Sequence, residues 1–251
     1  MFQRLRHLLV LVMLLLCVNT TSCFGNKAPE RSYFSIDYAL STQPKYDSPK
    51  YDATLVIQNI TSTLAYDRQE NVYRSNPYEF QYYWYRLWAS KPRKMLNETI
   101  LGHLQYTNLF KNVSTTIEDR MPDYFMDVYI VSIEELDVSD KEWYAHMSLK
   151  FTVTRSADSG VVWTYTFDAK RAVASNQPVY VVKAMSEMLS AELTQAFDDL
   201  DKKLAIIESA AVQPTPVTSS VSEPSHSPAD LTQDNDNAPT ATLKNTRNEQ
   251  R

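Results

Sequence analysis

Hydrophobic and polar residues alternate over long stretches in the second half of the chain, the pattern of strands buried on one face. Residues 147–154 place Met, Leu, Phe and Val on one side, and Ser, Lys and Thr on the other. After the turn-forming residues 155–160, residues 161–167 repeat the alternation, so the two segments predict a β-hairpin. Further strands are predicted by the same reasoning at residues 33–40, 53–60, 71–73, 113–117 and 124–133.

Two segments instead repeat their hydrophobic residues every three or four positions, as amphipathic helices do. The first covers residues 91–107, with Ser90 as the predicted N-cap, Pro92 in the first turn and Asn108 as the stop. The second begins at Pro178 and carries one apolar stripe along its length.

The order of these elements predicts a single α+β domain over residues 33–210, with a mainly antiparallel sheet covered on one face by two helices. From residue 211 to residue 251 the composition changes to Pro, Thr, Ser, Asn, Asp and Gln. Too few hydrophobic residues remain there to offset the entropy of ordering, so a disordered tail is predicted. The sequence leaves open whether this tail is an inert spacer or folds on binding.

The first 22 residues have the features of a secretion signal. Arg4 and Arg6 precede the apolar run 8–16, which is shorter than the roughly 20 residues of a membrane-spanning helix. Ser22 then places a small residue before Cys23. The stretch resembles a bacterial lipoprotein signal, which implies that Cys23 is lipidated and becomes the new N-terminus. An ordinary secreted protein with one leftover cysteine is the alternative, although a free thiol is a liability in an oxidising compartment.

Composition excludes several classes of function. The formal net charge is −5, and removal of Arg4 and Arg6 with the signal leaves 23 basic against 30 acidic residues, or −7. This charge disfavours binding to nucleic acid and electrostatic adhesion to anionic membranes, so acyl chains would provide the attachment. With only three glycines, all widely separated, the chain has no phosphate-binding loop.

No motif for catalysis or metal binding is present in the sequence. His103 and His146 each lack a second ligand at a suitable spacing, so structural or surface roles are expected. The acidic pairs at 134–135 and 198–199 are predicted to be solvated surface, because acid–base catalysis needs carboxyls that face one cleft. No GxSxG turn is found. We therefore expect no catalytic residue, no metal, no cofactor and no enzymatic activity.

An aromatic run at residues 78–88 is the strongest remaining feature. Its Tyr, Phe and Trp residues occupy odd and even positions alike, which is typical of a strand buried on both faces. Clustered Tyr and Trp also mark interfaces, so the alternative is a surface that contacts a partner protein or acyl chains. The candidates for this partner- or lipid-facing surface are Tyr83, Trp84, Tyr85 and Trp88.

Several short pieces of sequence occur in an order typical of one family. They are YFSIDY at 33–38, LAYDR at 64–68, VYR at 72–74, QYYWYRLWASKP at 81–92 and a helix that ends in NLF at 108–110. With the signal before them, they resemble the ABC-type transport auxiliary lipoproteins, the PqiC-like group. The pieces span nearly all of the predicted folded part, and none of them is a catalytic motif.

The resemblance implies a non-enzymatic periplasmic domain that serves an ABC-type system moving lipids between the two bacterial membranes. Residues 23–32 would be the lipid-anchored tether, with palmitate among the acyl chains. Phe24 is not the aspartate that retains lipoproteins at the inner membrane, which implies an anchor in the outer membrane. The implied partners are an MCE-domain substrate-binding protein and the ABC permease and ATPase, and self-association is left open.

Two other classes of function stay open at this point. One is a general envelope-assembly lipoprotein that binds proteins without a transporter. The other is a cell-wall or lipid hydrolase with a cryptic site, which would need a cleft with convergent polar groups of perturbed pKa.

Overall fold

The computed structural model describes residues 2–18, 29–41 and 43–212, which contain three helices and eight strands. These elements confirm the α+β class. In chain order they are α1 Phe2–Val18, β1 Ser32–Phe34, β2 Tyr51–Ser62, β3 Glu70–Arg74, β4 Gln81–Trp88, α2 Pro92–Thr107, β5 Phe110–Ser114, β6 Tyr124–Ser139, β7 Glu142–Arg155, β8 Val161–Val173 and α3 Pro178–Val212.

Strand β6 organises the sheet because it pairs with three other strands. It pairs antiparallel with β7 along nearly its whole length, and β7 pairs antiparallel with β8, which forms the predicted hairpin. Along its other edge, β6 pairs in parallel first with β2 and then with β3. The outer strands add β5 parallel to β2, β4 antiparallel to β3, and β1 parallel to β4.

The sheet is therefore mixed, and its two longest pairings are antiparallel; one of them, β7 with β8, is the hairpin that the sequence predicts. The parallel pairing of β2 with β6 follows from the connection between them. That connection contains β3, β4, α2 and β5, and parallel strands require a long crossover of this kind.

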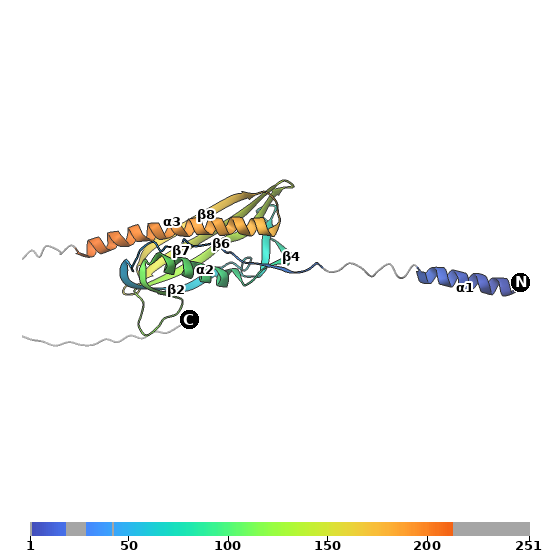
Figure 1. The fold of residues 1–251 in the computed structure, drawn as a ribbon, viewed down its shortest axis with the longest axis horizontal. Helices are drawn as coiled ribbons and strands as arrows, with labels where there is room; N and C mark the ends of the chain where they lie inside the picture. The colour runs from blue at the N-terminus through green and yellow to red at the C-terminus, as the bar shows by residue number, and fades with distance from the viewer. Residues whose placement is uncertain (1, 19–28, 42, 213–251) are drawn as a thin grey trace, which may run out of the picture. The chain divides into compact units, whose positions relative to one another are not determined.

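Helices α2 and α3 lie on the same face of the sheet, as predicted (Figure 1). Helix α3 packs on β7 and β8, whereas α2 packs on β2 and β5, and the two helices also contact each other. Met147, Leu149 and Phe151 of β7 are fully buried on this face. They form one core with α3 residues such as Leu193 and Phe197.

Some element boundaries differ from the sequence prediction. Helix α2 has Lys91 rather than Ser90 at its N-cap, without a side-chain capping bond, while Asn108 ends it in the left-handed region at φ 53°. The predicted strand 33–40 is shorter, because β1 ends at Phe34. Ile36, beyond the end of β1, is buried in the core.

Helix α1 corresponds to the predicted signal. The side chains of Leu5, Leu8 and Leu9 in this helix are more than half exposed. Among residues 2–18, 29–41 and 43–212, no helix combines the length and the apolar character needed to cross a membrane. Cys23 and residues 213–251, predicted as the lipidation site and as most of the tail, lie outside the described residues.

Candidate functional site

The four aromatic residues predicted to face a partner or lipid have very different environments. Trp84 is 80% exposed and Tyr85 is 41% exposed, whereas Tyr83 is partly buried. Trp88 is only 2% exposed and belongs to the core, so the prediction that it lies on a contact surface is wrong. The alternative, burial of the strand on both faces, is also wrong for Trp84 and Tyr85.

A large bulge in β4 explains this exposure. Val72 pairs with Tyr82, and Glu70 pairs with Leu87, so residues 83–86 of β4 lie opposite a single residue of β3. Such bulges interrupt the ladder and redirect side chains. Trp84 and Tyr85 are the exposed residues of this bulge. The regular strand, buried on both faces, that the sequence favours is therefore interrupted within β4.

Stacked side chains hold the bulge in place. The rings of Tyr73 and Tyr83 stack with their centroids 4.3 Å apart. The Arg86 guanidinium lies 4.1 Å from the centroid of the Tyr83 ring and donates a hydrogen bond to the carbonyl of Asn176 at 3.0 Å. The bulge is thus attached both to β3 and to the segment that leads into α3.

A buried ionic network, which the sequence analysis missed, surrounds Glu134 of β6. The Glu134 carboxylate is 2.7 Å from the Tyr66 hydroxyl, 2.6 Å from Arg74 Nη2 and 2.9 Å from His146 Nδ1. Glu134 is 1% exposed, so its predicted place on a solvated surface is wrong. Burial favours the neutral acid, but the hydrogen bonds from His146, Arg74 and Tyr66 outweigh it and lower the pKa of Glu134.

The network includes a serine and a histidine in an order that invites comparison with a hydrolase. Ser132 Oγ is 3.3 Å from His146 Nε2, and the other ring nitrogen faces Glu134. However, Nε2 lies closer to Asp168, at 2.8 Å, and Ser132 is only 4% exposed. A catalytic serine needs a base aimed at its hydroxyl and access for substrate. This arrangement is therefore a structural cluster.

Glu135, the next residue, points to the opposite face of β6, because side chains alternate along a strand. It is 4% exposed, and its Oε1 atom has no hydrogen-bond partner among the described residues. Burial, reinforced by the nearby Asp137, raises the pKa of Glu135 to about 8. The adjoining small cavity is lined by residues that include Asn71, Tyr83, Arg86, Val182 and Met185.

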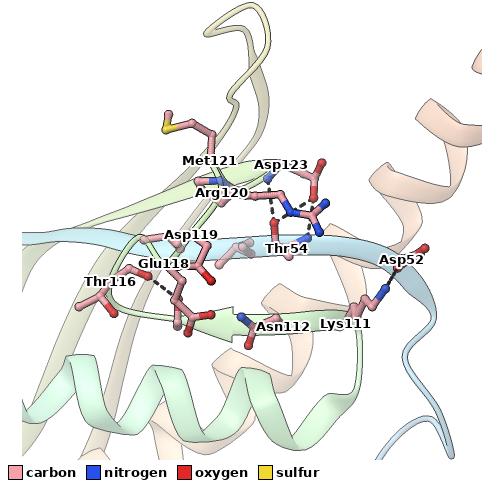
Figure 2. Close-up of a pocket in the computed structure, with 14 residues that line it drawn as sticks. Asp52, Thr54, Lys111, Asn112, Thr116, Glu118, Asp119, Arg120, Met121 and Asp123 are labelled. Atoms are coloured by element: carbon pink, nitrogen blue, oxygen red, sulfur yellow. Dashed lines mark hydrogen bonds and ion pairs between the residues drawn. The ribbon is translucent and has the colours of Figure 1, made fainter.

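A polar groove lies between β2, β5 and the loop that leads into β6 (Figure 2). The Asp123 carboxylate accepts hydrogen bonds from the Thr54 amide at 2.8 Å and from the Thr54 hydroxyl at 2.9 Å. Lys111 and Asp52 form an exposed ion pair at 2.6 Å. These contacts fasten the loop to β2, and the groove mixes acidic and basic side chains without a recognisable catalytic set.

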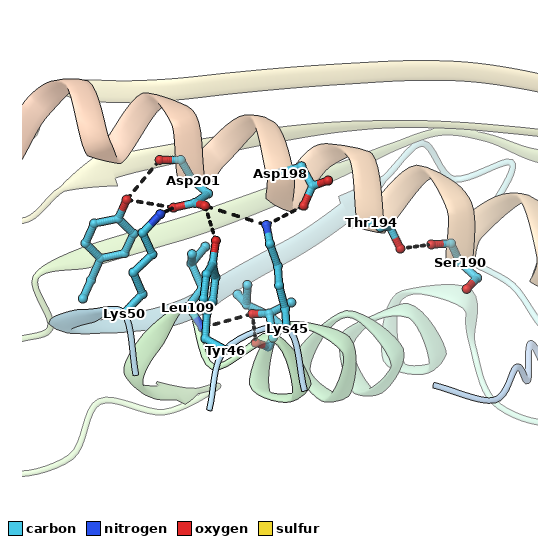
Figure 3. A network of polar contacts seen from close by, with 11 residues as sticks. Lys45, Tyr46, Lys50, Leu109, Ser190, Thr194, Asp198 and Asp201 are labelled. Carbon is cyan, nitrogen blue, oxygen red and sulfur yellow. Dashed lines mark hydrogen bonds and ion pairs between the residues drawn. The ribbon is translucent and has the colours of Figure 1, made fainter. Parts of the chain in front are cut away.

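Acidic residues of α3 clamp the segment that precedes β2 (Figure 3). The Asp201 carboxylate lies 2.6 Å from Lys50 Nζ and 2.8 Å from the Tyr51 hydroxyl, and it also accepts a hydrogen bond from Tyr46. Asp198 pairs with Lys45 at 2.5 Å. The clamp therefore joins the entry of the sheet to the last helix.

Asp199, the second residue of the acidic pair 198–199, is exposed as predicted. Its carboxylate accepts a hydrogen bond from Trp163 Nε1 at 2.8 Å, which ties α3 to β8. Asp198 is half-exposed, so the predicted solvated surface at 198–199 is confirmed, although both carboxylates also have partners in other parts of the chain.

Asp201→Ala is expected to lower the free energy of unfolding by roughly 2–3 kcal/mol, because it removes hydrogen bonds between a charged, mostly buried acceptor and its donors. Asp198→Ala is the matched control, and a loss below about 1 kcal/mol is expected for its half-exposed ion pair. Urea unfolding followed by circular dichroism measures both. Equal losses for the two variants would show that Asp201 contributes no more than the half-exposed ion pair of Asp198.

His103 has a structural environment. Its Nδ1 atom is 3.0 Å from the Tyr38 hydroxyl, and its ring packs edge-on against Phe197. Burial lowers the pKa of His103 to about 4, so the imidazole is neutral at physiological pH. In the part of the chain that the structure describes, no group of three or more His, Cys, Asp or Glu residues is placed to hold a metal ion.

One family model and several solved structures are similar to this chain. The family model described as "ABC-type transport auxiliary lipoprotein component" matches residues 38–196. The crystal structure of protein XCC0632 from Xanthomonas campestris is similar with a TM-score of 0.61 and 17% identity, over 71% of this chain and 99% of that one. A second crystal structure, of an uncharacterised protein, has a TM-score of 0.55 and 12% identity, over 68% and 99%. Comparison with curated protein sequences gives no match.

Proposed function

The chain belongs to the family of ABC-type transport auxiliary lipoprotein components, and from this membership we propose that it is a non-enzymatic, lipid-anchored subunit of a system that moves lipids between two bacterial membranes. The observation that carries the proposal is the family match over residues 38–196, which covers most of the folded domain. The resemblance in the short motifs of the sequence supports the same assignment.

The geometry of the polar clusters supports a non-catalytic role. The carboxylate of Glu134 is used by three donors within the fold, and Asp201 is likewise used by Lys50, Tyr51 and Tyr46. Ser132, the residue best placed to resemble a nucleophile, is buried. These groups stabilise the domain, and a binding or positioning role remains for its surface.

Attachment by lipid would provide the location that such a subunit needs. One acyl chain gives marginal membrane binding, whereas several chains, at about 0.8 kcal/mol for each buried CH₂ group, give a stable anchor. Confinement near a membrane raises the effective concentration of the domain toward membrane-bound partners. We propose Cys23 as the lipidated residue, the outer membrane as the site of the anchor, and the periplasm as the compartment of the folded domain.

The proposed partners are an MCE-domain substrate-binding protein and, through it, an ABC permease and ATPase. The basis for these partners is the resemblance to the PqiC-like group. An auxiliary subunit of this kind would contribute contacts and position, while ATP hydrolysis would occur in the ATPase.

Cys23→Ala is expected to abolish incorporation of labelled palmitate and to move the protein from the membrane fraction to the soluble fraction. The wild-type protein is expected to co-purify with an MCE-domain protein after mild detergent extraction. Trp143→Phe, a change in a partly buried residue of β7, serves as a control that should alter neither result. A membrane-bound Cys23→Ala protein would contradict the anchor, and a wild-type protein that captures no transport component would contradict the function.

A further inference from the structure

We propose that the bulge of β4 rests in the interfacial layer of the bilayer that holds the lipid anchor, with Trp84 and Tyr85 among the headgroups. This proposal rests on the proposed lipid anchor at Cys23, and it adds a second contact that orients the domain. On this proposal, the exposed surface of the bulge contacts a phospholipid bilayer and not a protein.

The first observation is the exposure of two large aromatic side chains at one point. Trp84 is 80% exposed and Tyr85 is 41% exposed, on a bulge whose base is held by the Tyr73–Tyr83 stack. Trp and Tyr combine an apolar ring with a polar group, and they concentrate at the boundary between membrane and water. A rigid support for exposed rings of this type suits insertion into headgroups.

The second observation is the position of the bulge beside the end of the tether. Strand β1 pairs with β4, and its first residue, Ser32, lies opposite Arg86 of the bulge. Fully extended, the residues from Cys23 to Ser32 reach at most about 30 Å. The edge formed by β1 and β4 is therefore the part of the sheet that a lipid on Cys23 would hold nearest to the bilayer. Tyr33 of β1 adds another ring at this edge and is 58% exposed.

The test uses the full-length lipidated protein in vesicles of phosphatidylethanolamine and phosphatidylglycerol with brominated acyl chains, which quench nearby tryptophan fluorescence. The protein has four tryptophans, and Trp88 and Trp163 are buried. We expect quenching of the wild-type emission, and Trp84→Phe is expected to remove most of it. Trp143→Phe is the matched control, with the same substitution in a partly buried residue of β7, and should keep the quenching.

Each other outcome overturns the inference in a distinguishable way. If the lipid anchor inserts into the vesicle membrane but the quenching of tryptophan fluorescence does not depend on Trp84, this inference fails and the proposed function stands. If Trp84→Phe instead abolishes co-purification with the MCE-domain protein without changing the quenching, the surface faces a protein. If the lipidated protein does not bind to the vesicle membrane at all, both the inference and the proposed anchor fail.

Discussion

Replacing Glu134 with alanine is expected to destabilise the folded domain by about 3–5 kcal/mol, the usual cost of removing one partner from a buried ion pair. The carboxylate accepts hydrogen bonds from Tyr66, Arg74 and His146, and its side chain is fully enclosed. Without it, the guanidinium of Arg74 would remain mostly buried with an uncompensated charge. Urea unfolding of the purified protein, followed by circular dichroism, measures the loss.

Two controls separate charge from packing at this site. Glu134→Gln keeps the shape and some of the hydrogen bonds but removes the charge, so an intermediate loss is expected. Glu98→Gln changes an exposed glutamate of α2 and should alter stability by less than about 0.5 kcal/mol. A Glu134→Ala protein as stable as the wild type would show that the network does not support the fold.

Replacing Glu135 with glutamine is expected to have the opposite effect and to stabilise the domain at neutral pH. The folded-state pKa of Glu135 is about 8, whereas an unfolded glutamate has a pKa of about 4.3. Between these values the folded protein holds a proton that the unfolded chain releases, so wild-type stability falls as pH rises from about 4 to 8. Glutamine does not titrate, so the variant escapes this loss, which is roughly 3–4 kcal/mol at pH 7.

The groups around Glu135 determine the direction of this effect. Burial is the largest cause, Asp137 adds to the increase in the pKa, and Arg86 and Tyr83 act against it. Unfolding free energies of wild type and Glu135→Gln, measured from pH 4 to pH 8, should be similar at the acidic end and diverge as pH rises. Curves that stay parallel over this range would show that Glu135 is ionised in the folded protein.

The sequence predicted much of the fold but misjudged the acidic pair Glu134 and Glu135. The β7–β8 hairpin and α3 were predicted because their patterns repeat over short distances in the chain. Glu134 and Glu135 follow Ile133 in a strand that continues to Ser139, and their environments come from residues such as Tyr66 and Arg86, about 50 to 70 positions away. One signal for their burial was available in the sequence. Residues 143–147 of β7 need a neighbouring strand to pair with, and β6 supplies it by continuing through Glu134 and Glu135.

The aromatic run at residues 78–88 was likewise predicted only in part. Its composition marked β4 correctly as unusual, but its residues divide between the core, as for Trp88, and the surface, as for Trp84. The bulge that separates them depends on pairing with β3 and β1. A contact of Trp84 and Tyr85 with a partner or lipid stays a prediction, which the quenching experiment addresses.

By itself, the sequence determined the α+β class, the two helices on one face, the long antiparallel hairpin and the family, because these depend on local periodicity and on the order of motifs. Only the tertiary structure decided which acids are buried, which strands run parallel and which aromatic rings remain in water. The physical reason is that burial, pKa and exposure depend on neighbours brought together from distant parts of the chain, and one sequence does not show which segments become neighbours.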